Sequence, residues 1–503
     1  MSIAKKIPIF VLKLISKGSA VKKTTFCEIN AKLSPAVPVE NFSDAGNAEK
    51  LVKFCGDRIR YCHAFRKWLV FDGLRWVTTP NESMIRLALE TIRHMVSEAE
   101  SLPSDLRSRM LRHSLASESL GRLTAMVSLA GALLPIQPGE LDRNPLLLNL
   151  INGTLDLSTG KLRKHNSGDF ITKLAPVKYD HMAKCSKFLG FIKRIMGRDK
   201  PLLAYLQRAV GYSLTSQTKE QCFFFLHGRG ANGKTVLLNT LRNILGDYAL
   251  QSPPELLLTK DRQGGATPEL ARLPGARLVC TSETEDGHRF AENTIKQLTG
   301  GDVIAARHLY GELFEFKPTF KIWLAANHKP IIRGTDLGIW RRIHLIPFNV
   351  TIPQNEQDKN LETKLMDEWP GILNWSIAGC RKWITTGLQP PDAVVESVDE
   401  YRTDMDTFGE FLNECCVLDA QAITTANELY LRYKFWAEQN IGKYMMSPNS
   451  FGRHLSERGF RKIRDAHTKS WKGIRIRGSE LVRSANPARG RRGEENGLDD
   501  LLP

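Results

Sequence analysis

Residues 221–245, which read QCFFFLHGRGANGKTVLLNTLRNIL, decide the fold expected for the middle of the chain. The apolar and aromatic run 221–226 is typical of a buried strand. It leads into Gly228-Arg229-Gly230-Ala231-Asn232-Gly233-Lys234-Thr235, a complete Gx4GK(S/T) phosphate-binding loop. Residues 236–245 have helical character, so strand, loop and helix stand in the order that a P-loop domain requires.

The residue types of this loop indicate how it would hold a nucleotide. Its glycines let backbone N–H groups converge on the β-phosphate, and Lys234 can reach the β- and γ-phosphates. The Thr235 hydroxyl is placed to ligate magnesium. ATP and Mg2+ are therefore the expected cofactors, and every residue from Gly228 to Thr235 is expected to line the nucleotide. A P-loop alone does not distinguish kinases, GTPases, motors and helicases, so other segments must decide.

The composition of the 503-residue chain favours a polyanionic partner. Lys and Arg outnumber Asp and Glu by 71 to 54, which gives a net charge of +17 and a pI near 9.4. Such a balance favours nucleic acid over a membrane surface. The nine cysteines form no CxxC pair and no zinc spacing, as is typical of reduced thiols. Pro8 breaks the apolar run 7–12, so we expect no export and no membrane span, but a cytoplasmic location in a bacterial host or at a viral replication site.

Changes of pattern along the chain predict five parts. Asp72-Gly73 and Asn152-Gly153 are strong hairpin signals on either side of a long helical stretch, which predicts an α+β domain before the P-loop. Strands and helices then alternate, as in a parallel α/β domain, until Pro390-Pro391. The predicted parts are a flexible leader at 1–45, the α+β domain at 46–185, the P-loop domain at 186–388, a C-terminal domain at 394–480 and a disordered tail at 481–503.

Acidic and amide side chains follow two further strands expected in the P-loop domain. The run 277–282 leads into Glu283 and Glu285, which project to the same side of an extended chain. Carboxylates there could hold magnesium, for which Glu283 is the predicted ligand, or orient the attacking water. The residues leave open which of the two polarises the water. The buried-strand pattern 320–326 ends at Asn327, whose amide could contact the γ-phosphate or the water.

Two adjacent arginines precede the next expected strand, at 343–348. Arg341 or Arg342 could reach across a subunit boundary to the neighbouring nucleotide and stabilise charge in the transition state. The alternative for two adjacent arginines is a solvated pair without a catalytic role.

The order of these motifs resembles that of the superfamily 3 helicases, and most closely the phage- and plasmid-type primase-helicases that share an ATPase with the poxvirus primase-helicase. The resemblance covers roughly residues 48–477 and implies an AAA+-like P-loop ATPase core, preceded by an α+β domain and followed by a winged-helix-like domain. It rests on the P-loop, on Ser282-Glu283-Thr284-Glu285, on the strings at 295–302, 306–312, 316–319, 324–330, 334–336 and 340–343, and on the upstream segments 54–61, 68–73 and 152–157.

The resemblance also implies a role for each candidate residue. Family members work as hexameric rings on single-stranded DNA, so single-stranded and forked DNA and further copies of the chain are the implied partners. The implied roles are Walker A for Lys234 and Thr235, Walker B for Glu283 and Glu285, a position near nucleotide and DNA for Lys296, a DNA-contacting channel hairpin for Arg307 and His308, the sensor for Asn327, and the finger supplied in trans for Arg341 or Arg342.

The end of the chain interleaves basic and apolar residues. Phe451, Leu455 and Phe460 have near-helical spacing, and 471–477 alternates apolar with basic residues. A basic helix beside a basic two-stranded wing would suit phosphate contacts, and the family often ends in a winged helix. The alternative is a solvated helix packed on the ATPase. The predicted DNA contacts are Arg453, Arg458, Arg461, Lys462 and Lys472.

The expected function is that of an ATP-dependent DNA helicase of phage or plasmid replication. We expect no primase activity in this chain, because the first 45 residues are too few for such a domain. A separate primase and a polymerase are therefore expected partners. Two alternatives stay open: a non-processive initiator-type ATPase that melts DNA, and a non-catalytic DNA-binding prophage remnant.

Overall fold

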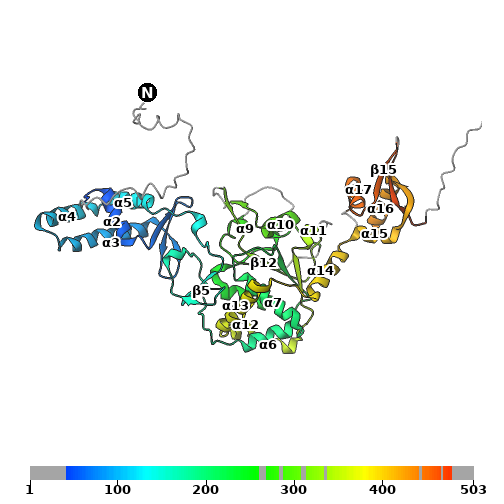
Figure 1. The fold of residues 1–503 in the computed structure, drawn as a ribbon, viewed down its shortest axis with the longest axis horizontal. Helices are drawn as coiled ribbons and strands as arrows, with labels where there is room; N and C mark the ends of the chain where they lie inside the picture. The colour runs from blue at the N-terminus through cyan, green and yellow to red at the C-terminus, as the bar shows by residue number, and fades with distance from the viewer. Residues whose placement is uncertain are drawn as a thin grey trace, which may run out of the picture. The chain divides into compact units, whose positions relative to one another are not determined.

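The computed structural model describes residues 41–259, 268–282, 287–307, 313–332, 337–440, 445–465 and 468–478. By its contacts the chain divides into two units. Residues up to Arg143 and His165–Lys173 form the first, and Asn144–Lys164 and the chain from Leu174 onward form the second. Figure 1 shows the elements of both. Within the described ranges, no helix has the length and apolar content needed to cross a bilayer.

The first unit combines a β-meander with helices, as the hairpin and helix signals predict. The Asp72 carboxylate accepts hydrogen bonds from the N–H groups of Leu74 and Arg75, both at 2.8 Å, and so fixes the turn at Asp72-Gly73. The long helical stretch is divided into separate helices near Pro103 and Ser119. The elements are α2 (Asp44–Cys55), β1 (Ile59–Cys62), β2 (Lys67–Phe71), β3 (Trp76–Thr79), α3 (Asn81–Ala99), α4 (Ser104–Ser117) and α5 (Leu120–Leu133).

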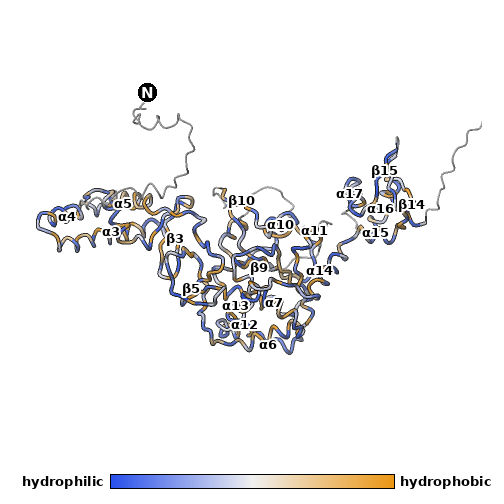
Figure 2. The backbone as a smooth tube through the Cα atoms, viewed as in Figure 1, coloured by the Kyte–Doolittle hydropathy of each residue, from blue (hydrophilic) through white to orange (hydrophobic). Residues whose placement is uncertain are grey.

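The core of the first unit lies between these helices and the meander. In Figure 2, hydrophilic and hydrophobic residues alternate along α3. Met84, Ala88, Ile92 and Met95 of α3 are buried at helical spacing and share a core with Trp68 of β2. This face therefore holds the helices against the sheet.

The second unit is built on a five-stranded parallel sheet in the order β13-β7-β12-β9-β8. This order places β12 between the strand that precedes the P-loop and the strand that precedes the acidic pair. The elements before the C-terminal region are β4 (Leu147–Leu150), β5 (Gly153–Asp156), β6 (Leu162–Arg163), α6 (Ser186–Ile195), α7 (Lys200–Ser213), β7 (Phe223–His227), α8 (Lys234–Leu245), β8 (Ala249–Gln251), α9 (Pro268–Ala271), β9 (Leu278–Ser282), α10 (Glu292–Gly300), β10 (Ile304–Arg307), β11 (Leu313–Phe316), β12 (Lys321–Ala326), α11 (Leu337–Trp340), β13 (Ile343–Pro347), α12 (Leu361–Met366), α13 (Trp369–Thr386) and α14 (Asp392–Asp404).

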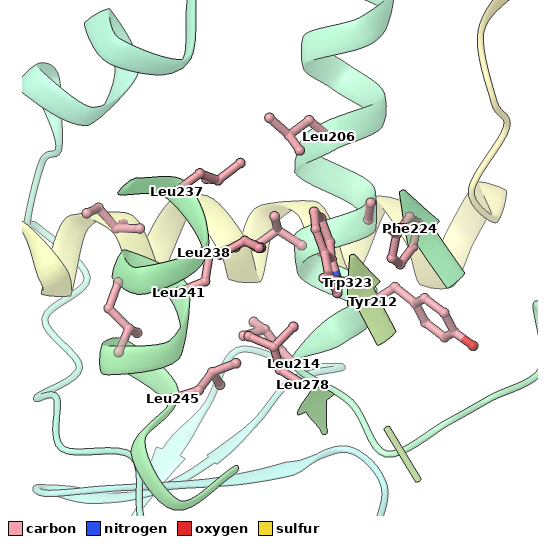
Figure 3. Close-up of a cluster of buried hydrophobic side chains, with 14 of the residues drawn as sticks. Leu206, Tyr212, Leu214, Phe224, Leu237, Leu238, Leu241, Leu245, Leu278 and Trp323 are labelled. Atoms are coloured by element: carbon pink, nitrogen blue, oxygen red, sulfur yellow. The ribbon is translucent and has the colours of Figure 1, made fainter. Parts of the chain in front are cut away.

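Both faces of this sheet are covered, which explains why its strands are apolar without alternation. Phe224 and Trp323 face one core cluster, and Figure 3 shows them opposite leucines of α8. Phe225 and Leu324 face a second cluster, which includes Ile295 of α10. The predicted mixed α/β fold with a parallel sheet is confirmed.

The hairpin around Asn152-Gly153 belongs with the P-loop domain, whereas the sequence placed it in the preceding domain, which was expected to end at 185. Leu148 and Leu155 are buried in the same cluster as Phe224. The Asn149 N–H also donates to the Tyr248 hydroxyl at 3.2 Å. A hairpin whose leucines are buried against the parallel-sheet domain cannot be separated from that domain, and no turn signal in the sequence reveals that packing.

α14 also belongs with the P-loop domain, although Pro390-Pro391 was expected to mark the end of that domain. Tyr401 is fully buried in the second cluster, beside Val398 and Met405. The prolines end one helix without ending the domain, because the chain returns to cover the sheet.

The C-terminal region contains a small helical and β core of its own. Its three-stranded antiparallel sheet has the order β14-β16-β15. Phe411, Tyr433, Phe451 and Trp471 are buried together. The elements are α15 (Thr407–Cys415), β14 (Cys416–Thr425), α16 (Ala426–Asn440), α17 (Pro448–Glu457), β15 (Arg461–Arg464) and β16 (Lys469–Ile476).

Candidate nucleotide-binding site

The P-loop connects the end of β7 to the start of α8, as predicted. Gly230 and Gly233 have φ of 54° and 84°, in the left-handed region that favours glycine. A Cβ on Gly228 would lie 2.3 Å from the Phe348 carbonyl oxygen, and one on Gly233 would lie 2.8 Å from Ile195. The loop therefore needs these glycines to turn closely against its surroundings.

Lys234 lies at the centre of the loop and is 6% exposed. Its ammonium donates to the carbonyl oxygen of Gly228 at 2.5 Å and to the side-chain oxygens of Asn232 at 3.1 Å and Asn327 at 3.0 Å. Burial lowers the pKa of Lys234. These three neutral oxygens stabilise the ammonium less than an anionic phosphate would, so the arrangement favours a phosphate ligand.

Asn327 is brought to the P-loop by the pairing of parallel strands. Ala326 of β12 is opposite His227 of β7, so the residues that follow both strands meet at one edge of the sheet. The Asn327 side-chain oxygen also accepts from the Gly230 N–H at 3.4 Å. The structure therefore places Asn327 beside Lys234.

Asn232 braces the loop in a way that the sequence did not reveal. Its side chain is 3% exposed and donates to the Phe348 carbonyl oxygen at 3.2 Å. The Ile352 N–H donates to the Ala231 carbonyl oxygen at 2.8 Å. Both contacts fasten the loop to the chain after β13, and only the three-dimensional structure brings these segments together.

The remaining residues at this edge fit a nucleotide with its metal ion. Thr235 is exposed in the first turn of α8, so its hydroxyl is accessible to magnesium. β9 ends at Ser282, which is paired with Ala325 of β12. Glu283 and Glu285 follow directly but lie outside the described residues, so the predicted acid pair stays a prediction.

His227 also lies at this edge, and the sequence analysis did not single it out. Burial lowers its pKa to about 4, helped by the nearby ammonium groups of Lys329 and Lys234. At neutral pH His227 is therefore uncharged and adds no positive charge to that of Lys234 and Lys329.

The two predicted arginines lie near the amino ends of the sheet strands, opposite the end that carries the P-loop, and their environments differ. Ile343, the first residue of β13, is opposite Phe223, whereas Pro347 is opposite His227. Four residues of strand, about 13 Å, therefore separate the arginines from the level of their own P-loop. Arg342 is 8% exposed and donates to the Thr299 hydroxyl at 3.1 Å and to the Gly338 carbonyl. Arg341 is exposed and contacts the Gln221 side chain at 3.4 Å.

The hairpin predicted around Arg307 is present as an antiparallel pair of strands, and its position in a channel stays a prediction. β10 and β11 pair from Ile304 opposite Phe316 to Arg307 opposite Leu313. Arg307 is exposed at the end of β10, and Lys296 lies on α10. His308 lies outside the described residues.

The predicted basic residues of the C-terminal region have different surroundings. Arg458 forms an ion pair with Asp406. Arg453 is exposed on α17. In the strand pair, Arg461 is directly opposite Lys472, and the Lys462 ammonium lies 5.7 Å from the Trp471 ring centroid.

Two family models match the chain, one on each side of the start of the P-loop strand. The model described as "D5 N terminal like" matches residues 48–197. The model described as "Family of unknown function (DUF5906)" matches residues 226–342, which include the P-loop and both arginines.

Viral proteins are among the relatives. A protein of Acanthamoeba polyphaga mimivirus named "putative helicase" is 32% identical, over 60% of this chain and 34% of its own length. A "putative helicase" of Frog virus 3 is 27% identical, over 52% and 29%. A "putative primase" of African swine fever virus is 25% identical, over 60% and 34%. The chain therefore spans about a third of the length of the curated relatives it matches.

A solved structure of the C-terminal region of NrS-1, in its apo form, is also similar. It is 12% identical with a TM-score of 0.45, and the match covers 85% of this chain and 99% of that one.

Proposed function

The chain belongs to the D5-like superfamily 3 primase-helicase family, and on that premise we propose that it is an ATP-dependent DNA helicase that acts as a homohexameric ring on single-stranded DNA. The contact of Lys234 with Asn327 carries this proposal, because it joins a phosphate-binding loop to a polar side chain on the adjacent strand. ATP with Mg2+ would supply the phosphoryl group that is transferred to water.

In the nucleotide site, Lys234 would exchange its neutral partners for phosphate oxygens. Its contact with the exposed Asn327 amide can break by rotation of that side chain, which leaves the ammonium free to neutralise charge on the transferred group. Asn327 would then orient the γ-phosphate or the water. Thr235 and Glu283 would hold the metal ion, and Glu283 or Glu285 would polarise the water.

We assign the finger supplied in trans to Arg341. Arg342 is fixed inside its own subunit by Thr299 and Gly338, so its guanidinium is not available to a neighbour. Arg341 is exposed at the edge of the sheet far from its own P-loop, as a residue that serves another subunit must be.

The strand pair β10–β11 would carry DNA contacts in the ring channel. Arg307 is exposed at its end, beside His308, and we expect both to bind the phosphate backbone. Arg307→Ala should therefore retain ATPase activity and lose strand separation in a tailed-duplex assay. Normal unwinding by this variant would contradict the channel assignment.

The C-terminal region would bind DNA as a winged helix, with β15 and β16 as the wing. Its order of helix, strand, two helices and two strands is that of winged-helix domains. Arg461 is directly opposite Lys472, and Arg464 is opposite Lys469. Like charges directly opposite each other destabilise a sheet, and phosphates would relieve that repulsion. The wing thus supports backbone contacts, with Arg453 on α17 beside them.

The experiment that tests this function is ATP-dependent displacement of one strand from a tailed duplex, with Lys234→Ala as the inactive control. We expect displacement by the unchanged protein alone. An initiator that only melts DNA would hydrolyse ATP without displacing the strand, and a non-catalytic remnant would bind DNA without turnover. Either result would contradict the proposal.

A further inference from the structure

α14 contacts the nucleotide-site segment that follows Asn327. It packs against β13, and in Figure 1 it lies beside α11. Tyr401 of α14 is fully buried, and its hydroxyl donates to the carbonyl oxygen of Pro330, three residues after Asn327. The helix is therefore attached to the backbone that carries the sensor residue.

An ion pair strengthens this attachment one turn further along α14. The Lys329 ammonium lies 2.7 Å from the Asp404 carboxylate and 5.5 Å from the centroid of the Tyr401 ring. The Lys329 side chain is 20% exposed and that of Asp404 is 54% exposed, so only the lysine is shielded from solvent. Tyr401 and Asp404 together fix the two residues that follow His328.

Tyr401 also contacts the helix that precedes the arginine pair. Its ring is edge-on to Trp340, with ring centroids 5.3 Å apart, and Trp340 directly precedes Arg341. The same side chain packs against Phe225 of β7 at 6.1 Å. One buried tyrosine thus contacts the sensor segment, the P-loop strand and the base of the proposed finger.

The other end of α14 leads directly into the C-terminal region. Asp406 accepts a hydrogen bond from the Gly409 N–H at 2.9 Å and so caps α15. The same carboxylate pairs with Arg458, which follows α17. Within the three residues 404–406, the chain is therefore bonded both to the nucleotide-site segment and to the end of the proposed DNA-binding helix.

We propose that α14 is a coupling helix, in which Tyr401 and Asp404 position the Asn327 segment and make ATP turnover respond to DNA bound by the C-terminal region. This inference rests on the proposed function. If α14 had only a structural role, substitutions in it would change stability alone. If it is a coupling helix, they change the stimulation of ATP turnover by DNA.

The test uses the full chain and measures ATP turnover with and without single-stranded oligonucleotide, together with KM for ATP, DNA affinity and the unfolding midpoint. Asp404→Asn removes the ion pair with little change of shape. Glu400→Gln is the matched control, because Glu400 is exposed on the same helix and the charge change is the same. Tyr401→Phe keeps the ring and removes its hydrogen bond to Pro330.

We expect Asp404→Asn and Tyr401→Phe to keep KM for ATP and DNA affinity, while the ratio of DNA-stimulated to basal turnover falls about fivefold. Glu400→Gln should be stimulated like the unchanged protein. The charge exchange Lys329→Asp with Asp404→Lys should restore stimulation, because it rebuilds the ion pair with reversed charges.

Full stimulation in Asp404→Asn and Tyr401→Phe would overturn the coupling inference, as would an equal loss in Glu400→Gln. Both results leave the proposed function intact, because the unchanged protein still turns over ATP. Absence of turnover in the unchanged protein would instead contradict the proposed function and, with it, the coupling.

Discussion

Two buried lysines at opposite ends of the same sheet show what distinguishes a site from a structural feature. Lys234, at the P-loop edge, is held by one loop carbonyl and two amide side chains. Lys321, at the start of β12, is 1% exposed and donates to the carbonyl oxygens of Thr215 and Gln217. Burial lowers the pKa of both, for Lys321 with a contribution from Arg277. Burial and pKa therefore do not separate them.

The two lysines differ in whether the hydrogen-bond partners of the ammonium group can be replaced by a ligand. The partners of Lys321 are backbone groups just after α7, and its ammonium also lies 4.8 Å from the centroid of the Tyr212 ring. Replacing them would require the core to open. The partners of Lys234 include a glycine-rich loop and the exposed amide of Asn327, which can rotate away, so the ammonium can move to a phosphate without opening the core. We therefore propose Lys234 as the functional lysine because its cation is available, and not because it is buried.

The largest expected effect comes from removing the available lysine. Lys234→Ala should lower ATP turnover by at least about a thousandfold, because the transferred phosphoryl group loses its main cationic partner. The unfolding midpoint and DNA binding by the C-terminal region should persist, as measured by calorimetry and oligonucleotide binding. Loss of both turnover and DNA binding would break the division into a nucleotide site and a DNA-binding region.

The same contrast between available and fixed cations separates the two arginines. Arg341→Ala should lower DNA-stimulated kcat by about a thousandfold with little change in stability, as expected for a finger. Arg342→Ala should instead lower the free energy of unfolding by about 1–3 kcal/mol, because a buried hydroxyl and carbonyl lose their donor. Turnover assays and denaturant titrations of both variants check this assignment, and a reversed pattern would make Arg342 the finger.

Lys321→Met tests the comparison of the two lysines, and its expected effect on turnover is smaller than that of Lys234→Ala. It removes a costly buried ammonium but leaves two carbonyl oxygens without their donor, so the two changes partly offset, and we expect a stability loss below about 2 kcal/mol. Turnover should stay close to that of the unchanged protein. A folded Lys321→Met variant without ATPase activity would show that the fixed lysine takes part in the chemistry.

The last prediction concerns the pH dependence of stability, through a histidine in the same sheet. His344 lies against Tyr205 and Phe224, and burial lowers its pKa to about 4. Because the unfolded chain binds this proton near pH 6.5, stability should fall as the pH drops from about 6.5 to 4, by roughly 3 kcal/mol in all. His344→Gln should flatten that fall in unfolding experiments across this range. An unchanged pH dependence would contradict the lowered pKa, because it would mean that His344 has the same pKa in the folded and the unfolded chain.

The local sequence was sufficient where one segment contains the whole signal. Residues 221–245 predict strand, loop and helix, and Asp72-Gly73 predicts its hairpin, because both depend on neighbours in the chain. The sequence also predicted Asn327 at the end of a buried strand, and the pairing of parallel strands places it beside Lys234, whereas its contact with a nucleotide stays a prediction.

The features that the sequence did not reveal depend on contacts between distant segments. The sequence does not predict that Tyr401 of α14 is buried against the parallel-sheet domain, because Pro390-Pro391 before the helix indicates the end of a domain. β14 was also missed, because its register shifts between Asp419 and Ile423. Two adjacent arginines look equivalent until Thr299, from a distant helix, is seen to hold one of them.

The central claim is that each nucleotide site is shared by two subunits, with Lys234 from one and Arg341 from the next. The most direct test is ATP turnover by an equal mixture of Lys234→Ala and Arg341→Ala chains on single-stranded DNA. In a randomly mixed ring, about a quarter of the interfaces would combine an intact lysine with an intact arginine. The account predicts turnover well above that of either variant alone, and a mixture no more active than its components would contradict it.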